Sequence, residues 1–359
     1  MWSYTGLTGN EPGMMACIGK SALIIGGTGL IGTGAAQRLL NGGWEVIVVS
    51  RGRRAAPSAG EGIRHVQADG HDVATLRRLA AGGVDAVIDV IPYSASDAEA
   101  LMELADLTAS ITAISSAAVY ADVSGEPLLR GFESPPAPKI GPIRETQRTV
   151  APAEAGYAEQ KAAMELTLLD QDRVPVSILR PGAVFGPGDT AAREWFFVRR
   201  CLDRRPHVVL ASRGQSTFHQ SYSENVAELV ACCARQPGRR VLNAVNERAL
   251  SELEIGRLIA TTLGWEWREV LLEGPPIGGV GETPWSTPSP FVLDLTEATR
   301  LGYRDVVAPE QAIARTVDWL RRVAADDPQR YLPRALDYYG HMLGNYAAED
   351  AVIAARDAE

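Results

Sequence analysis

Residues 22–32 read Ala-Leu-Ile-Ile-Gly-Gly-Thr-Gly-Leu-Ile-Gly, and this stretch decides the fold. A short apolar run that ends in glycines is typical of a strand buried on both faces. Gly26, Gly29 and Gly32 follow it at intervals of three, and the residues from Leu30 to Asn41 have the periodicity of a helix with one apolar face. A strand, a glycine-rich turn and a helix in this order form the context in which such a turn binds a dinucleotide.

The three glycines of the turn have separate tasks. One permits the tight bend, one lets the backbone approach a pyrophosphate, and one lets the helix pack closely on the strand. The start of the helix adds free N–H groups and a partial positive charge, which favour phosphate. A tight turn without a ligand is the alternative. The residues that we predict to bind a nicotinamide dinucleotide here are Gly26, Thr28, Gly29, Leu30, Ile31 and Gly32.

The end of the second predicted strand, residues 45–49, bears on the choice between NAD(H) and NADP(H). An acidic residue there would bind the ribose hydroxyls of NAD and repel the additional phosphate of NADP. The residues that follow the strand are instead Ser50, Arg51, Arg53 and Arg54. A guanidinium suits a 2′-phosphate because it is a planar fork of donors, so NADP(H) is favoured, unless the arginines merely solvate a loop. Asp69, after the third strand, is a candidate partner for the adenine amino group or an ordinary turn residue.

Apolar strands alternate with helical patterns from Ser21 to about Ile114, and this order predicts an α/β Rossmann fold with a doubly wound parallel sheet. The alternation decays beyond Gly188, where we expect a smaller C-terminal α/β lobe that binds the substrate. The expected parts are a disordered N-terminal extension (1–20), a Rossmann dinucleotide-binding domain (21–188), a mainly substrate-binding lobe (189–326) and a C-terminal helical tail (327–359).

Local sequence also predicts where two helices begin. Ser96 with Glu99 and Ser251 with Glu254 both have the spacing of a capping box, in which the two side chains bond each other's backbone N–H groups. A helix is therefore expected after each serine.

Composition limits the class of protein. The chain has 359 residues and a formal net charge of −9, which disfavours nucleic acid and anionic membranes as partners. No apolar run is long enough to span a bilayer, and residues 1–20 lack the pattern of a secretory signal. The four cysteines show neither metal-ligand nor redox spacing. We expect a cytoplasmic protein without a metal.

Three residues have the chemistry of a hydride-transfer site. Tyr157 and Lys161 are four apart in a predicted helix, so they share one face. A phenol has a pKa of about 10, and a nearby ammonium and the nicotinamide ring would lower it toward neutral pH. Ser116 follows a predicted strand at the carboxyl end, where such sheets place ligands, and its hydroxyl can bond the reacting oxygen. We predict that these three are catalytic and that Lys161 also holds the nicotinamide ribose.

At this point the sequence resembles the extended short-chain dehydrogenase/reductases, which include the NAD-dependent epimerase/dehydratase family. The motifs that carry the resemblance are the glycine turn, Ser115-Ser116-Ala117-Ala118-Val119-Tyr120, Tyr157-x-x-x-Lys161 and the run from Arg180 to Asp189. The resemblance covers roughly residues 21–322. It implies that Ser116, Tyr157 and Lys161 form the catalytic triad, that Pro181 lies in the cofactor site, and that the chain forms a homodimer through the helix of Tyr157 and its neighbour.

Two departures from the family concern the substrate. Family members that eliminate water carry two carboxylates where this chain has Ala117 and Ala118, so dehydration is disfavoured. Enzymes that act on sugar nucleotides bring an arginine to the diphosphate from the stretch near Gly214, whereas this chain offers His219. The arginines that could compensate are Arg193, Arg199 and Arg200, although solvated helix charges are the more ordinary interpretation.

Two further departures from the family are present, and the first of them reshapes the substrate side of the cleft. The segment from Ile91 to Ile111 is short, and residues 89–93, Asp-Val-Ile-Pro-Tyr, replace the small-residue loop near the cofactor. The tail beyond Asp326 is longer than the family needs.

An aromatic run, residues 195–197, either walls an apolar substrate pocket or packs in the core.

The leading hypothesis is an NADP(H)-dependent oxidoreductase that transfers hydride between nicotinamide and a ketone or secondary alcohol of a small organic substrate. Two alternatives are open: a sugar or nucleotide-sugar epimerase with bound NAD(P), and a cofactor-binding regulator or RNA-associated protein on the same fold. The presence of both Tyr157 and Lys161, and the negative charge, speak against the last.

Overall fold

We describe a computed structural model of the chain in residues 19–52, 62–133, 141–323 and 327–358. Nearly all of the predicted N-terminal extension, and the candidate cofactor residues Arg53 and Arg54, lie outside these ranges.

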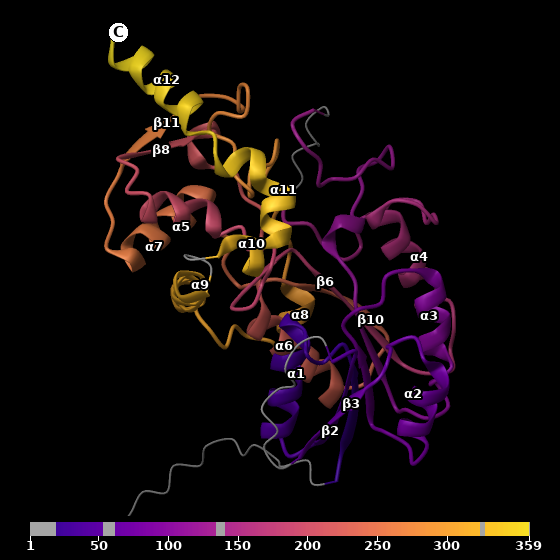
Figure 1. The fold of residues 1–359 in the computed structure, drawn as a ribbon. Coiled ribbons are helices and arrows are strands. Elements are labelled where there is room, and N and C mark those ends of the chain that lie inside the picture. Colours follow the sequence, from indigo (N-terminus) through magenta and orange to yellow (C-terminus); the bar gives the residue numbers. More distant parts are fainter. Residues whose placement is uncertain (1–18, 53–61, 134–140, 324–326, 359) are drawn as a thin grey trace, which may run out of the picture.

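A seven-stranded sheet in which every pairing is parallel forms the centre of the larger part of the molecule (Figure 1). Its strands run in the order β10-β6-β5-β4-β1-β2-β3, so the chain starts in the middle and winds outward in both directions. The bounds are β1 Ser21–Ile25, β2 Glu45–Ser50, β3 Ile63–Gln67, β4 Ala86–Asp89, β5 Ile111–Ile114, β6 Val176–Pro181 and β10 Arg240–Ala244. The Rossmann fold predicted from the alternation is confirmed.

Helices cover both faces of this sheet. On one face, α1 packs against α6 over a core that includes Ala35, Leu39 and Val230. On the other, α2, α3 and α4 bury a separate core around Leu76, Leu101 and Met164. The bounds are α1 Leu30–Asn41, α2 Val73–Ala80, α3 Ala95–Met102, α4 Tyr157–Leu169 and α6 Ser223–Arg235. The central strands β4, β5 and β6 are thereby buried along their whole length, as their apolar sequences require, whereas the edge strand β3 keeps exposed residues.

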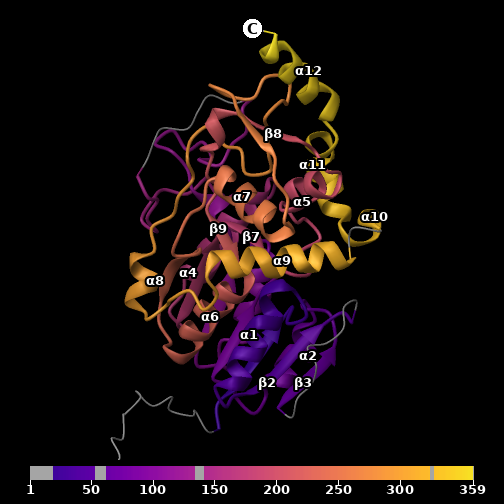
Figure 2. The same ribbon diagram turned by 90° about the vertical axis from the view of Figure 1, so that its left-hand side faces the viewer.

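A smaller lobe sits at one end of the sheet and has its own core (Figure 2). It contains two short parallel sheets, β7 with β9 and β8 with β11. The bounds in the lobe are β7 Ala183–Phe185, α5 Trp195–Leu202, β8 His207–Leu210, β9 Gln220–Tyr222, α7 Glu252–Leu263, β11 Arg268–Leu271 and α9 Pro309–Val323, with a short 3₁₀ turn at Ser212–Gly214. Outside the lobe, α8 Thr296–Arg300 packs on β10 of the large sheet, and a 3₁₀ turn at Ala117–Val119 follows β5.

The C-terminal tail forms three helices that follow the side of this lobe, drawn in yellow in Figure 1. They are α10 Pro328–Tyr331, α11 Pro333–Leu343 and α12 Tyr346–Asp357. Leu332, Ala335 and Leu343 are buried in the core of the lobe, so the tail belongs to the packed structure.

The two capping predictions differ in outcome. Ser251 and Glu254 form the capping box that begins α7, as predicted. The prediction at Ser96 is wrong, because α3 begins two residues earlier with Ser94 as N-cap and Asp97 completing the box. Asp97 also accepts the N–H of Tyr93, so the local network selects the earlier start.

Candidate active site

The glycine-rich turn between β1 and α1 is shaped for a close approach of backbone and ligand. Gly26 has a φ of 79°, in the region that favours glycine. A Cβ on Gly32 would lie 2.6 Å from the carbonyl oxygen of Gly26 and 2.7 Å from the Cα of Gly27, so helix and strand pack in contact there. Gly29 caps α1 without a side-chain hydrogen bond, and the first turn has no acidic residue. The first N–H groups of the helix are therefore available to an anion.

A cleft of about 620 Å³ opens beside this turn, at the carboxyl ends of the strands. Its lining includes the cofactor candidates Gly26, Thr28, Gly29, Ser50, Arg51 and Asp69. Leu30 lines a neighbouring pocket, whereas the side chain of Ile31 is buried in the core, so only the backbone of Ile31 can take part in binding. The size and the glycine cradle fit a dinucleotide.

The far end of this cleft carries the residues expected to hold the adenosine half. Ser50 hydrogen-bonds His65, with 2.8 Å between Oγ and Nε2, and Arg51 is exposed at the end of β2. Asp69 lines the cleft with one carboxylate oxygen accepting the N–H of His71. The described residues at the end of β2, Ser50 and Arg51, do not include a carboxylate.

Ser116 and Tyr157 come together at the carboxyl edge of the sheet. Ser116 ends the segment after β5, and its Oγ accepts the N–H of Ala118 at 3.2 Å. Tyr157 is the first residue of α4 and is 49% exposed. Burial raises the pKa of the Tyr157 phenol, a hydrogen bond with Ser116 lowers it, and the charge of Arg334 also lowers it. The net pKa is above the ordinary value, so the phenol is a proton donor at neutral pH.

Lys161 lies one turn deeper in α4 and is buried. Its ammonium donates to the carbonyl oxygens of Pro92 and, at 3.0 Å, of Ile114. Burial lowers the pKa of Lys161 to about 8, while the carboxylate of Asp89 opposes the shift. Burial in turn raises the pKa of Asp89 to about 7. Lys161 is not among the causes that shift the Tyr157 pKa here, and the expectation that the ammonium and a bound nicotinamide together lower that pKa stays a prediction.

Tyr93 is a member of the site that the sequence did not single out. Its ring lies 5.6 Å from the ring of Tyr157, and the Lys161 nitrogen is 6.0 Å from its centre. It belongs to the loop 89–93, whose unusual sequence was the available signal, although that signal did not reveal which residue faces the phenol.

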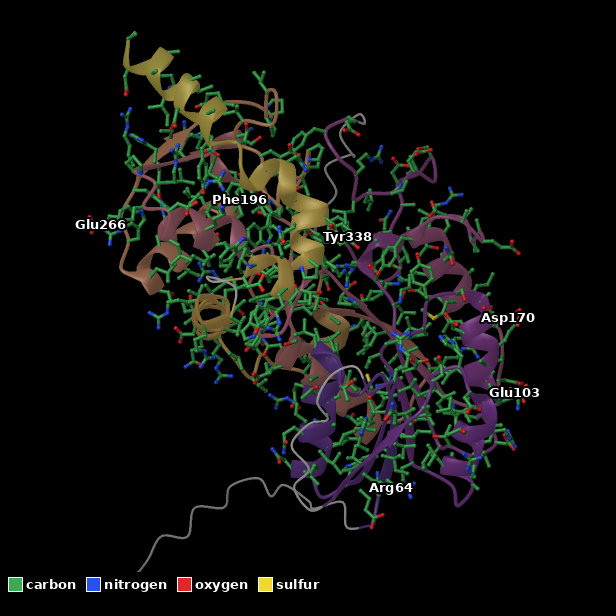
Figure 3. All side chains as sticks on the ribbon, viewed as in Figure 1. Arg64, Glu103, Asp170, Phe196, Glu266 and Tyr338 are labelled. Atoms are coloured by element: carbon green, nitrogen blue, oxygen red, sulfur yellow. The ribbon has the colours of Figure 1, made fainter. Side chains whose placement is uncertain are left out.

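Pro181 ends β6 and is buried, one residue before Gly182, which lines a second pocket. This pocket of about 310 Å³ adjoins the dinucleotide cleft. Its other lining residues include Arg193, Arg334, Tyr338 and Tyr339. Figure 3 labels Tyr338 on α11, in the middle of the molecule. The sequence offered no signal for Arg334 or Tyr338 beyond an amphipathic tail helix.

Arg193 is held over two aromatic rings at the wall of this pocket. Its guanidinium lies 5.3 Å from the ring centre of Phe218 and 5.8 Å from that of Tyr339. Its Nη1 donates to the carbonyl of Val184 at 3.4 Å, which leaves other N–H groups of the fork for a ligand.

Three other candidates for the substrate side are bonded to partners within the protein. His219 is buried with both ring nitrogens bonded, to the carbonyl of Asn246 and the N–H of Leu293, and burial lowers its pKa to about 4. Arg200 is fully buried and pairs with Glu349, so interpreting it as a solvated charge is wrong. Arg199 is partly exposed and pairs with Asp203.

The aromatic run at the start of α5 belongs to the core. Trp195, Phe196 and Phe197 are all at most 4% exposed and pack with Trp285 and Ile259. They do not form a substrate wall.

Within the described ranges, no group of three or more His, Cys, Asp or Glu side chains is arranged to hold a metal ion. In the same ranges, no helix is both long and apolar enough to cross a bilayer.

A family model described as the NAD dependent epimerase/dehydratase family matches residues 22–245. This range contains the glycine turn, Ser116, Tyr157 and Lys161, and it makes up more than half of the chain. None of the curated proteins matches the chain in sequence.

Solved structures share the fold at low sequence identity. UDP-glucose 4-epimerase from Thermotoga maritima, solved with UDP-glucose, is 18% identical with a TM-score of 0.64 and covers 84% of this chain and 99% of its own. dTDP-glucose 4,6-dehydratase from Bacillus anthracis, solved with NAD, is 14% identical with a TM-score of 0.64 and covers 85% and 97%. A variant of UDP-glucuronic acid 4-epimerase from Bacillus cereus, solved with NAD, is 16% identical with a TM-score of 0.62 and covers 85% and 100%. These likenesses show the fold, and 15–16% of this chain has no counterpart in them.

Proposed function

The chain belongs to the NAD-dependent epimerase/dehydratase family, and we propose that it is an NADP(H)-dependent oxidoreductase acting on a ketone or secondary alcohol of a small organic molecule. The observation that carries the proposal is the interaction of the Ser116 hydroxyl with the Tyr157 phenol, which also feels the charge of Arg334, a lining residue of the cleft. Two hydroxyls at this edge of the sheet can hold one substrate oxygen between them.

Ser116, Tyr157 and Lys161 would each have a different task in the reaction. Ser116 donates a hydrogen bond to the substrate oxygen as negative charge develops on it. Tyr157 then gives its proton to that oxygen, since its phenol is protonated at neutral pH. Lys161 fixes the loop at Pro92 and the end of β5 at Ile114, so it keeps the floor of the site in place. A bound nicotinamide would supply or accept the hydride.

The residues that would hold the cofactor are those of the glycine turn, Ser50, Arg51 and Asp69. Selection of NADP(H) is supported by Arg51, whose exposed guanidinium stands where an NAD-specific carboxylate would be. Arg53 and Arg54 lie outside the described residues and remain candidates from the sequence.

Small substrates are favoured over nucleotide sugars by the substrate side of the site. The pocket next to the cleft is about 310 Å³, the low end of the range for small-molecule sites. His219 is buried and bonded at both nitrogens, so it cannot bind a diphosphate. Ala117 and Ala118 provide neither the acid nor the base of a dehydration.

The test is turnover of NADPH and NADH with a panel of ketones, followed by the absorbance of the reduced nicotinamide. We expect net consumption with NADPH, and a fall of about 10²- to 10⁴-fold in kcat for Tyr157→Phe, with a smaller fall for Ser116→Ala. Interconversion of epimers without net consumption would instead identify an epimerase. Binding of NADPH with no turnover of any carbonyl would overturn the enzymatic proposal in favour of a cofactor-binding regulator.

A homodimer through α3 and α4 is also proposed. These helices pack together, and α4 leaves Leu166 57% exposed on its outer side. An exposed leucine on such a face suits a helix-to-helix interface. Leu166→Arg should turn a dimer into a monomer in sedimentation experiments, and a wild-type chain that sediments as a monomer would refute the proposal.

A further inference from the structure

We propose that Arg334, on tail helix α11, binds the pyrophosphate of the dinucleotide from the side opposite the start of α1. The inference rests on the proposed function insofar as it needs a dinucleotide in the cleft. It assigns a cofactor ligand to the tail, which the family model does not reach, since that model ends at residue 245.

The position of Arg334 is the first argument. The cleft of about 620 Å³ is lined both by the glycine turn and by Thr190 and Arg334 from distant parts of the chain. The same two residues also line the adjoining pocket of about 310 Å³, so they stand at the junction of the two spaces. A dinucleotide lying along the glycine turn presents its pyrophosphate to the N-terminus of the following helix, which places that group between α1 and Arg334.

The tail is held firmly enough to position a ligand. The N–H of Ala335 donates to the carbonyl of Thr190 at 3.0 Å, which joins the start of α11 to the other residue of the junction. Ala335 and Leu332 are completely buried beneath it. Further along, α12 is fastened by the buried pair of Glu349 with Arg200 and by Ile353 in a small apolar cluster.

Charge is the second argument. A pyrophosphate carries negative charge that the partial charge of one helix terminus matches only in part. Arg334 is exposed to the cleft and can present a planar pair of donors to two phosphate oxygens. Its own helix orients it, because Nη2 donates to the Tyr338 hydroxyl at 3.2 Å and the guanidinium lies 5.4 Å from the Tyr338 ring centre. Asp189, which lines the adjoining pocket of about 310 Å³, places a negative charge near Arg334.

The experiment compares Arg334→Gln with Arg330→Gln in the full chain. Arg330 is an exposed arginine of the same tail that packs on Tyr331 and does not line either space, so it is a matched control. Binding of NADPH, ADP and adenosine is measured by calorimetry or competition. Thermal unfolding without ligand checks that both variants fold as the wild type does.

We expect Arg334→Gln to weaken NADPH and ADP about 10- to 100-fold, the range for loss of a charge-assisted hydrogen-bonded contact, and to leave adenosine unchanged. Arg334→Lys should recover part of the loss, and Arg330→Gln should bind all three ligands as the wild type does. The difference in affinity between the wild type and Arg334→Gln should also be smaller at high salt. Equal ADP affinity in the wild type and Arg334→Gln would overturn the assignment to the pyrophosphate. A wild-type chain that binds neither NADPH nor NADH would instead overturn the proposed function.

Discussion

Arg180 and Glu165 form a buried bidentate ion pair that joins β6 to α4, the helix that carries Tyr157. The bonds are 3.0 Å from Nε to Oε1 and 2.5 Å from Nη2 to Oε2, and both residues are at most 4% exposed. The guanidinium also lies 4.8 Å from the ring centre of Tyr120, whose hydroxyl donates to Asn243 at 2.6 Å. The helix of Tyr157 is therefore tied to β6 by a buried ion pair, and Tyr120 adds a buried hydrogen bond to β10.

Glu165→Gln should destabilise the protein strongly, because it leaves a buried guanidinium without a counter-charge. We expect a loss of about 3–5 kcal/mol in the free energy of unfolding. The control is Glu269→Gln in the exposed pair with Arg257, where about 1 kcal/mol or less should be lost. Urea denaturation measures both, and similar losses in the two variants would contradict the prediction.

Lys161 should make stability depend on pH. Its pKa is about 8 in the folded chain and about 10.5 when unfolded, so between these values the unfolded chain binds more protons. The free energy of unfolding then rises with pH across this window, because the cost of a buried ammonium disappears. In Lys161→Met this part of the rise in the free energy of unfolding should be missing, so the two proteins should differ in that rise by about 1–3 kcal/mol. Denaturation curves at pH 7 to 10.5 test it, and parallel pH profiles for the two proteins would refute it.

Gly32→Ala should damage both stability and cofactor binding. The added methyl would lie within 2.7 Å of the backbone of Gly26 and Gly27, which cannot yield without moving the turn. We expect about 1–3 kcal/mol of destabilisation, typical of overpacking, and weaker binding of NADPH. Gly82→Ala is the control, since nothing lies within 4 Å of its Cβ position. Calorimetric melting and ligand titration would show the contrast, and an unaffected Gly32→Ala would disprove the close contact.

Glu349→Gln should loosen the C-terminal helix from the lobe. Glu349 is 3% exposed and is the counter-charge of the fully buried Arg200, so about 3 kcal/mol or more should be lost. The adjacent Asp350 pairs with Arg205 at the surface, and Asp350→Asn should cost about 1 kcal/mol or less. Limited proteolysis should cut the tail of Glu349→Gln faster. Equal rates in both variants would show that the buried pair does not hold α12.

The sequence predicted correctly those features that depend only on residues close together in the chain. The helix of α1 was predicted from Leu30 to Asn41, with the bounds it has. The start of α7 at Ser251 followed from the capping box. The start of α3 was misplaced by two residues because two serines compete there, and only the bonds of Asp97 to the preceding loop select Ser94.

The candidate site was predictable only in part. Tyr157 and Lys161 share a helix, yet their environments differ because Lys161 is drawn to the carbonyls of Pro92 and Ile114. Tyr93 enters the site from a loop that is 64 residues distant from Tyr157 along the chain. Arg200 looks like any helix arginine, and its burial depends on Glu349, 149 residues later.

The sequence by itself determined the parallel sheet, the glycine turn and the residue types available for proton and hydride chemistry, since strand alternation, capping and turn geometry depend on neighbours in the chain. Tertiary packing decided which charges are buried, which rings face the Tyr157 phenol, and that Arg334 lines the cleft. Those outcomes depend on desolvation and on contacts between distant segments, and neither can be read from a local pattern.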